Sequence, residues 1–106
     1  FRRNKYNEEI GVLIYKNVKL DLDSYKAFVS DKEVMLTKRE FEILHELILN
    51  QGKILTREIL MERVWQYEYI GNARIVDNHI KNIRKKIGDE VIKTIRGVGY
   101  KVDKIY

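Results

Sequence analysis

The sequence has no cysteine, no apolar run of transmembrane length and no signal-peptide pattern. Without cysteine, disulfide bonds, thiol catalysis and cysteine-bound zinc are excluded. The other two absences argue against a membrane-spanning or secreted chain. The lack of cysteine also fits a cytoplasmic location, which we expect for this protein.

The composition of the chain is that of one globular domain. The chain has 106 residues, of which 44% are hydrophobic and 35% charged, values typical of a folded domain with a single core. It begins with Phe1 rather than Met, so we expect it to be part of a longer protein. Residues 1–9 are polar and lack periodicity, which indicates a linker remnant, and the domain is expected over 10–106.

The positive charge is concentrated at one end of the chain. Residues 1–70 contain 12 Lys or Arg and 12 Asp or Glu, whereas residues 71–106 contain nine and four. The whole net charge of +5 therefore belongs to the last third. A neutral scaffold with one basic end indicates a surface that binds a polyanion.

Within this basic third, residues 72–87 have the pattern of an amphipathic helix. Val76, Ile80, Ile83 and Ile87 recur at helical spacing and form an apolar stripe. The opposite face, about 100° wide, contains cations and amides: Arg74, Asn78, Lys81, Asn82 and Lys85. Such a face can be merely solvated, or it can bind phosphates and base edges. The location of the charge favours the second interpretation.

The first part of the chain predicts a small sheet and two helices. Four β-type runs, at 12–15, 18–22, 25–29 and 33–36, predict an antiparallel sheet of three or four strands. Thr37 and Glu40 have the spacing of a capping box, which starts a helix that ends near Gly52. Thr56 is the expected N-cap of a second helix, with Leu60 and Val64 on its buried side.

Isolated polar groups in this part do not indicate catalysis. His45 lies among glutamates with no second histidine at metal-ligand spacing, so we expect it to be solvated. Asp77 stands alone among cations, whereas a metal-dependent nuclease needs clustered carboxylates. Its expected partner is Lys81, four residues further on. We therefore expect neither an enzyme nor a bound metal or cofactor.

The segment 65–71 is rich in aromatic residues and admits two interpretations. Trp65 and Tyr67 can cover the edge of the core, or the segment can bind a protein or a phosphate, since aromatic residues are enriched at interfaces. A module that binds only proteins through this segment is the main alternative to a nucleic-acid-binding domain. It predicts no salt-dependent affinity for DNA.

Residues 91–103 predict a hairpin with Arg96, Gly97, Val98 and Gly99 at its tip. Glycine is expected there because tight hairpin turns need positive φ angles. A basic hairpin beside a basic helix can follow the duplex backbone or enter a minor groove. The alternative is an edge hairpin that uses lysines against aggregation.

Taken in order, these motifs closely resemble the effector domain of the OmpR/PhoB family of bacterial response regulators. The resemblance rests on Leu36-Thr-Lys-Arg-Glu-Phe-Glu-Ile-Leu44, Leu55-Thr-Arg-Glu-Ile-Leu60, Val64-Trp65, Arg74-Ile-Val-Asp-Asn-His-Ile-Lys-Asn-Ile-Arg-Lys-Lys86 and Thr94-Ile-Arg-Gly-Val-Gly-Tyr100. It covers the chain from about residue 10. It implies an α+β fold, a winged helix-turn-helix with an N-terminal antiparallel sheet, three helices and a C-terminal hairpin wing.

The resemblance also implies roles for individual residues. The helix 72–87 would lie in the major groove, with bases facing Ile75, Asn78 and Asn82. Phosphates and backbone would be contacted by Trp65, Arg74, Lys81, Arg84, Lys85, Thr94 and Tyr100. Arg96 would enter the minor groove. RNA polymerase would be contacted by the loop formed by Gln66, Tyr67, Glu68, Tyr69, Ile70 and Gly71.

The family further implies the partners of the domain. These are double-stranded DNA with direct-repeat half-sites about one turn apart, RNA polymerase, and a phosphorylatable receiver domain outside this chain. The chain would bind DNA as a dimer and control transcription. Many relatives have an apolar residue and an arginine where this chain has Asn78 and Asn82. Two amides predict contacts to adenine, whose N6 and N7 match one amide group.

Overall fold

The computed structural model describes residues 11–66 and 72–105, in two sheets and three helices. The predicted linker remnant at 1–9 and residues 67–71 of the aromatic-rich segment 65–71 lie outside the described residues. The elements are β1 (Val12–Tyr15), β2 (Val18–Asp21), β3 (Lys26–Val29), β4 (Lys32–Val34), α1 (Lys38–Leu49), β5 (Leu55–Thr56), α2 (Arg57–Trp65), α3 (Ile75–Ile87), β6 (Lys93–Ile95) and β7 (Gly99–Lys101). Within the described ranges, no helix combines the length and apolar character needed to cross a bilayer.

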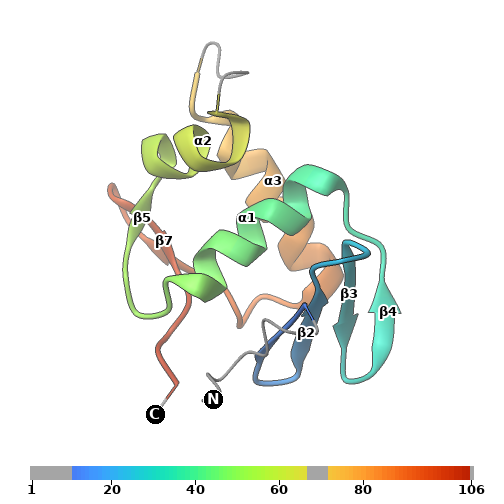
Figure 1. The fold of residues 1–106 in the computed structure, drawn as a ribbon. Helices are drawn as coiled ribbons and strands as arrows, with labels where there is room; N and C mark the ends of the chain where they lie inside the picture. The colour runs from blue at the N-terminus through green and yellow to red at the C-terminus, as the bar shows by residue number, and fades with distance from the viewer. Residues whose placement is uncertain (1–10, 67–71, 106) are drawn as a thin grey trace, which may run out of the picture.

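The first four strands form the predicted antiparallel sheet, in the order β1-β2-β3-β4. One face is buried because Leu13, Tyr15, Val18, Leu20 and Ala27 alternate with exposed or half-buried residues along the strands. Figure 1 shows this sheet at the lower right, α1 across the centre and α2 above it. The sheet therefore caps the helical part of the domain from one side.

Capping groups fix the starts of α1 and α2 where the sequence predicts them. The Thr37 hydroxyl accepts a hydrogen bond from the Glu40 N–H, and the Glu40 carboxylate accepts one from the Thr37 N–H, so the capping box is confirmed. Thr56 accepts from the Ile59 N–H at the start of α2. These bonds satisfy amide groups that have no partner inside the helix.

The predicted helix 72–87 is shorter at its start than expected. α3 begins at Ile75, because the Asn72 side chain and main-chain carbonyl accept from the N–H groups of Arg74 and Ile75, respectively, and form a turn. The apolar stripe is confirmed, since Val76, Ile80, Ile83 and Ile87 are all buried. The correction moves Arg74 to the N-cap position, just before the helix.

The C-terminal hairpin belongs to a three-stranded sheet, whose third strand the sequence did not predict. β5, only two residues long, pairs with β7, giving the order β5-β7-β6. Gly97 has the expected positive φ of 75°. Gly99 does not have a positive φ, which corrects the expectation. It lies within β7, opposite Thr56, where the two backbones approach closely.

One ion pair, between a half-exposed lysine and a buried carboxylate, fastens α3 to the start of α1. The Lys86 ammonium, in the last turn of α3, lies 2.8 Å from the Glu40 carboxylate, and Glu40 is only 3% exposed. Burial raises the pKa of Glu40, but the Lys86 hydrogen bond and the Thr37 N–H outweigh burial and lower it. The carboxylate is therefore ionised in the native state.

This pair gives a pH-dependent contribution to stability. We expect Lys86→Met to lower the free energy of unfolding by about 2 kcal/mol at pH 7, because it leaves a buried carboxylate without its cation. The folded-state pKa of Glu40 is depressed, so the stabilisation is complete above its unfolded value of about 4.3 and is lost as the pH falls through the folded value.

Urea unfolding of the wild type and Lys86→Met at pH 7 and pH 3 measures this effect. The difference between the two proteins should be full at pH 7 and smaller at pH 3, because protonation of Glu40 removes the charge that Lys86 neutralises. Lys85→Met, which removes an exposed lysine one residue earlier, is the control and should have little effect at either pH. An equal difference between wild type and Lys86→Met at both pH values would contradict the role of the ion pair.

Candidate nucleic-acid interface

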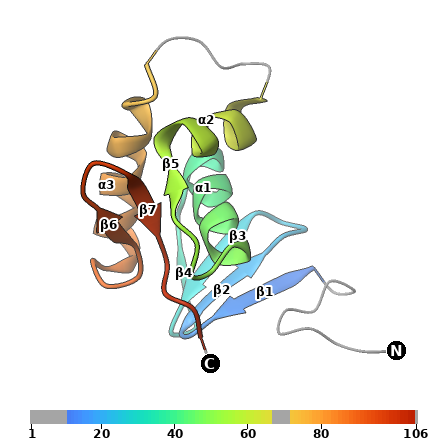
Figure 2. The same cartoon turned by 90° about the vertical axis from the view of Figure 1, so that its left-hand side faces the viewer.

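The exposed face of α3 is bordered by two packed edges. At about 100° per residue, Ile75, Asn78 and Asn82 share one stripe about 60° wide, and Arg74, Lys81 and Lys85 share the adjacent stripe. One edge of α3 lies against the hairpin β6–β7, which is visible in Figure 2, and the other lies against α1 and α2. The helix therefore presents a single face of amides, cations and one aliphatic side chain.

The side chains of this face are exposed and unengaged. Asn78, Asn82, Lys81, Lys85 and Arg74 are all exposed, and Ile75 is 39% exposed. Within 11–66 and 72–105, none of the four Asn and Lys side chains has a hydrogen-bond or ion-pair partner in the protein. These groups retain their full capacity to bind an external polar ligand.

Asp77 lies at the edge towards the hairpin and has partners other than the expected Lys81. Its carboxylate oxygen Oδ1 accepts from Arg57 Nε at 2.7 Å and from the Tyr100 hydroxyl. Burial raises the pKa of Asp77, but the bonds from Tyr100 and Arg57 outweigh burial and lower it. The carboxylate at the edge of the candidate face is thus neutralised internally and does not oppose a bound anion.

Arg84 joins the same edge to the hairpin. Its guanidinium donates to the Ile92 carbonyl at 2.8 Å and to the Thr94 hydroxyl oxygen at 2.7 Å, and it lies over the Tyr100 ring. Since Thr94 accepts here, its own O–H remains available as a donor. Tyr100 is 5% exposed and already donates to Asp77. The predicted phosphate contacts of these three residues stay predictions, but their internal contacts are clear.

The cluster formed by Arg57, Asp77, Arg84, Thr94 and Tyr100 therefore fixes the angle between α3 and the hairpin. Arg57, the first residue of α2, was not assigned a role from the sequence. The sequence gives only a weak indication of a role for Arg57, because a lone arginine after a Thr N-cap is also common on solvated helices. The cluster connects α2, α3 and both hairpin strands.

Removing the tyrosine hydroxyl tests this cluster. We expect Tyr100→Phe to lower the free energy of unfolding by about 1 kcal/mol, because Asp77 loses a charge-assisted hydrogen bond at a partly buried site. Urea unfolding measures the change. Tyr25→Phe, which loses a hydroxyl bonded to Glu42 at a more exposed site, is the matched control. Equal stability of Tyr100→Phe and wild type would contradict a positioning role.

The other edge of α3 is closed by aromatic packing. Trp65 is 8% exposed, and the His79 ring meets it edge-on at 5.2 Å while the Arg39 guanidinium lies over it at 5.1 Å. This agrees with the interpretation of Trp65 as a cover of the core edge, and its predicted phosphate contact stays a prediction. Gln66 is exposed and ends α2, whereas Tyr67–Gly71 lie outside the described residues.

The tip of the hairpin projects beyond the packed part of the domain. Arg96 is exposed, and Val98 beside it is 45% exposed. The turn is closed by a hydrogen bond from the Val98 N–H to the Ile95 carbonyl. An exposed cation and an exposed aliphatic group at a narrow tip suit insertion into a groove.

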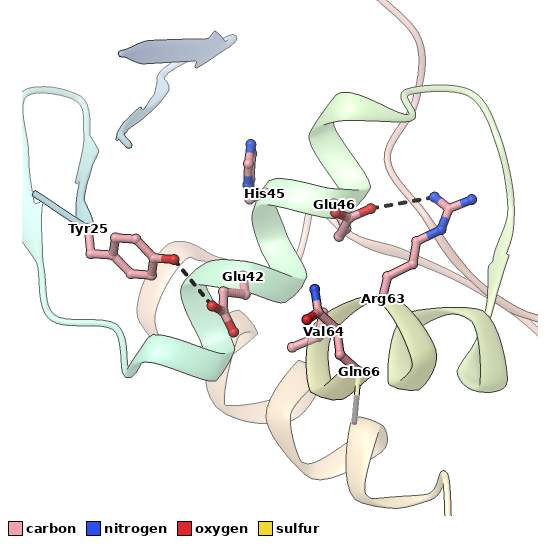
Figure 3. A pocket seen from close by; sticks show the side chains of 7 residues that line it. All are labelled: Tyr25, Glu42, His45, Glu46, Arg63, Val64 and Gln66. Atoms are coloured by element: carbon pink, nitrogen blue, oxygen red, sulfur yellow. Dashed lines mark hydrogen bonds and ion pairs between the residues drawn. The ribbon is translucent and has the colours of Figure 1, made fainter. Parts of the chain in front are cut away.

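A second surface feature has the opposite charge character. A hollow of about 160 Å³ lies between the β2–β3 turn, α1 and α2, and Figure 3 shows the Tyr25 hydroxyl pointing to Glu42 and the Arg63 guanidinium reaching Glu46. His45 lines it and is half-buried, not solvated as expected, and burial lowers its pKa. With two carboxylates and one arginine, this hollow does not suit a phosphate.

No group of three or more metal-ligating side chains occurs in the described part of the chain. The basic face of α3 with the hairpin tip is therefore the best supported candidate site. Its chemistry, which combines free amides, cations and aliphatic groups, matches the edges and backbone of a nucleic acid.

Comparisons with known proteins agree with this fold. The chain is 39% identical over 104 residues to the alkaline phosphatase synthesis transcriptional regulatory protein PhoP of Bacillus subtilis (strain 168), covering 93% of this chain and 43% of that protein. The chain thus spans less than half the length of this curated relative.

Two solved structures are similar as well. The response regulator DrrB, a Thermotoga maritima OmpR/PhoB homolog, is 40% identical with a TM-score of 0.79, over 89% of this chain and 45% of that one. The DNA-binding domain of the response regulator AdeR, solved in complex with an intercistronic region, is 29% identical with a TM-score of 0.76, over 87% and 98%.

The model of the family described as "Transcriptional regulatory protein, C terminal" matches residues 31–102. This range extends from β4 to the residue after β7, so it contains all three helices and the complete hairpin. The motifs, the fold and the relatives of this chain all indicate the same family. The chain belongs to this family, the OmpR/PhoB-type winged helix-turn-helix effector domains of response regulators.

Proposed function

We propose that this chain is the sequence-specific, double-stranded DNA-binding output domain of a two-component response regulator that controls transcription. α3 lies in the major groove, and the hairpin β6–β7 follows the backbone with Arg96 in the minor groove. The domain binds and does not catalyse. It acts in the cytoplasm, where bacterial DNA is accessible to it.

The observation that carries this proposal is the unengaged face of α3. Asp77 and Arg84, which border it, have internal partners, whereas Asn78, Lys81, Asn82 and Lys85 have none within the described residues. These four side chains share one exposed face of α3 and are available to an external ligand, whereas the charged groups at its edge are held by the protein. The solved complex of the similar AdeR domain with an intercistronic region supports the same use of the fold.

Each group of side chains has its own proposed role. Arg74, Lys81 and Lys85 neutralise phosphates and supply most of the affinity, because released counterions drive such binding. Thr94 donates its free O–H to a phosphate, and the edge of Trp65 lies against another. Tyr100 and Arg84 fix the angle between the hairpin and α3. Any contact of these two side chains with the DNA backbone is made from within this cluster.

The wider assembly follows the family. We propose that two copies bind direct-repeat half-sites about one helical turn apart, and that a receiver domain outside this chain controls this pairing. RNA polymerase is contacted through the loop from Gln66 to Gly71. The relatives' greater length supports the receiver domain.

Selection of bound duplexes from a random DNA pool tests this proposal. The enriched duplex and a scrambled duplex of equal length are then compared for affinity at 50 and 200 mM salt. We expect an enriched, repeated motif that binds at least about 1,000-fold tighter than scrambled DNA, with both affinities falling as salt rises. Salt-dependent binding without any enriched motif would contradict sequence specificity, and no binding would favour a protein partner.

A further inference from the structure

The stripe of α3 that the family resemblance assigns to the bases has a composition that restricts the DNA it can read. Ile75, Asn78 and Asn82 lie within about 60° on the helix surface, and no arginine shares this stripe. Arg84 is held at the hairpin edge by the Ile92 carbonyl and the Thr94 hydroxyl. Arginine and lysine are the usual readers of guanine, and this stripe contains neither, because Arg74, Lys81 and Lys85 lie on the adjacent stripe.

The two amides fit adenine and not guanine. One amide group presents a donor and an acceptor side by side, and both amides are exposed without a partner in the described residues. In the major groove, adenine offers a matching N6 donor and N7 acceptor. Guanine offers two acceptors, N7 and O6, so the amide oxygen would face an acceptor. Each asparagine therefore discriminates in favour of an A·T pair.

Ile75 extends this preference at the start of α3. It is 39% exposed although it is a large aliphatic residue, and it adjoins the two amides. The C5-methyl group of thymine is the apolar feature that a base pair presents in the major groove. Contact with this methyl group removes the Ile75 side chain from water, which is favourable by the area buried.

Helix geometry converts the three positions into a spacing along DNA. At 1.5 Å per residue, Asn78 and Asn82 are about 6 Å apart along the axis, close to two base-pair steps of about 3.4 Å. Ile75 lies about 4.5 Å before Asn78, a little more than one step. The three contacts thus fall within about four adjacent base pairs.

We propose that the half-site read by α3 has a core of about four base pairs of which three are A·T, with a thymine methyl group against Ile75 and one adenine against each of Asn78 and Asn82. This inference rests on the proposed function, because it names the class of DNA sequence that the same face reads.

Base analogues placed in the selected duplex test each contact separately. In turn, each core thymine is replaced by deoxyuridine, which lacks the methyl group, and each core adenine by 7-deazaadenine, which lacks N7. We expect one deoxyuridine to weaken wild-type binding about fourfold and to have no effect on Ile75→Ala. For each asparagine, we expect 7-deazaadenine at one core position to weaken wild-type binding about tenfold. The same analogue should have no effect on the affinity of the corresponding Asn→Ala variant.

Asn17→Ala, in the exposed turn before β2, is the matched control and should respond to every analogue as the wild type does. Selection with Asn82→Ala should also yield a changed preference at one core position. A tightly bound, specific core rich in G·C pairs would overturn this inference and leave the proposed function intact. Analogue effects that persist unchanged in the alanine variants would also overturn it. Absence of any DNA binding would overturn the proposed function itself.

Discussion

Replacing Gly99 by alanine should lower the free energy of unfolding by about 3 kcal/mol, at the upper end of overpacking costs. An added Cβ would lie 2.8 Å from Thr56 Cα and closer still to the Leu55 carbonyl oxygen. Both are backbone atoms of β5, so no side-chain rotation relieves the contact. β7 must move away from β5, and the pairing of Leu55 with Tyr100 is lost with it.

Gly97→Ala is the matched control for this change. Gly97 has a φ of 75° but nothing within 4 Å of an added Cβ, so it bears only the conformational cost, about 1 kcal/mol. Thermal unfolding should show a midpoint lower by about 15 °C for Gly99→Ala and by about 5 °C for Gly97→Ala. Equal midpoints for the two variants would contradict the close approach of β5 and β7.

The largest expected effect on binding comes from removing three cations of α3 together. The triple variant Arg74→Ala, Lys81→Ala, Lys85→Ala should bind every duplex about 100-fold more weakly near 150 mM salt, because each phosphate contact contributes about 0.9 to the slope of log K against log salt. The slope itself should fall by about 2.7. The preferred sequence should stay the same, since phosphate contacts do not read bases.

A charge-matched triple variant separates this effect from net charge. Lys16→Ala, Lys26→Ala, Lys32→Ala removes the same charge from exposed positions of the first sheet. This variant should change the slope of log K against log salt by well under one. Both triple variants should unfold at nearly the wild-type temperature. A similar loss of affinity in the two triple variants would show that overall charge, not the face of α3, attracts the DNA.

Sequence patterns of short range predicted much of this fold. The capping box at Thr37 and Glu40, the four strand runs and the buried stripe of α3 each depend on residues only a few positions apart. The free amides and lysines opposite the stripe were predicted for the same reason, because a helix fixes which side chains share a face.

The features that could not be predicted depend on partners distant in the sequence. Asp77 is bonded by Arg57 and Tyr100, which are 20 and 23 residues away, so its neighbour Lys81 was the wrong choice. Lys86 and Glu40 are 46 residues apart. β5 has two residues and no period to detect, and its pairing with β7 follows from the packing of the whole domain.

Mapping the bound DNA on the protein by NMR shows directly whether α3 and the hairpin tip form the DNA-binding surface. Backbone amide shifts of the labelled chain are recorded while the selected duplex is added. We expect the largest changes to cluster on the exposed face of α3 and at the hairpin tip around Arg96, with small changes around Glu42 and His45. Changes centred on the acidic hollow between α1 and α2, with α3 unaffected, would contradict this expectation.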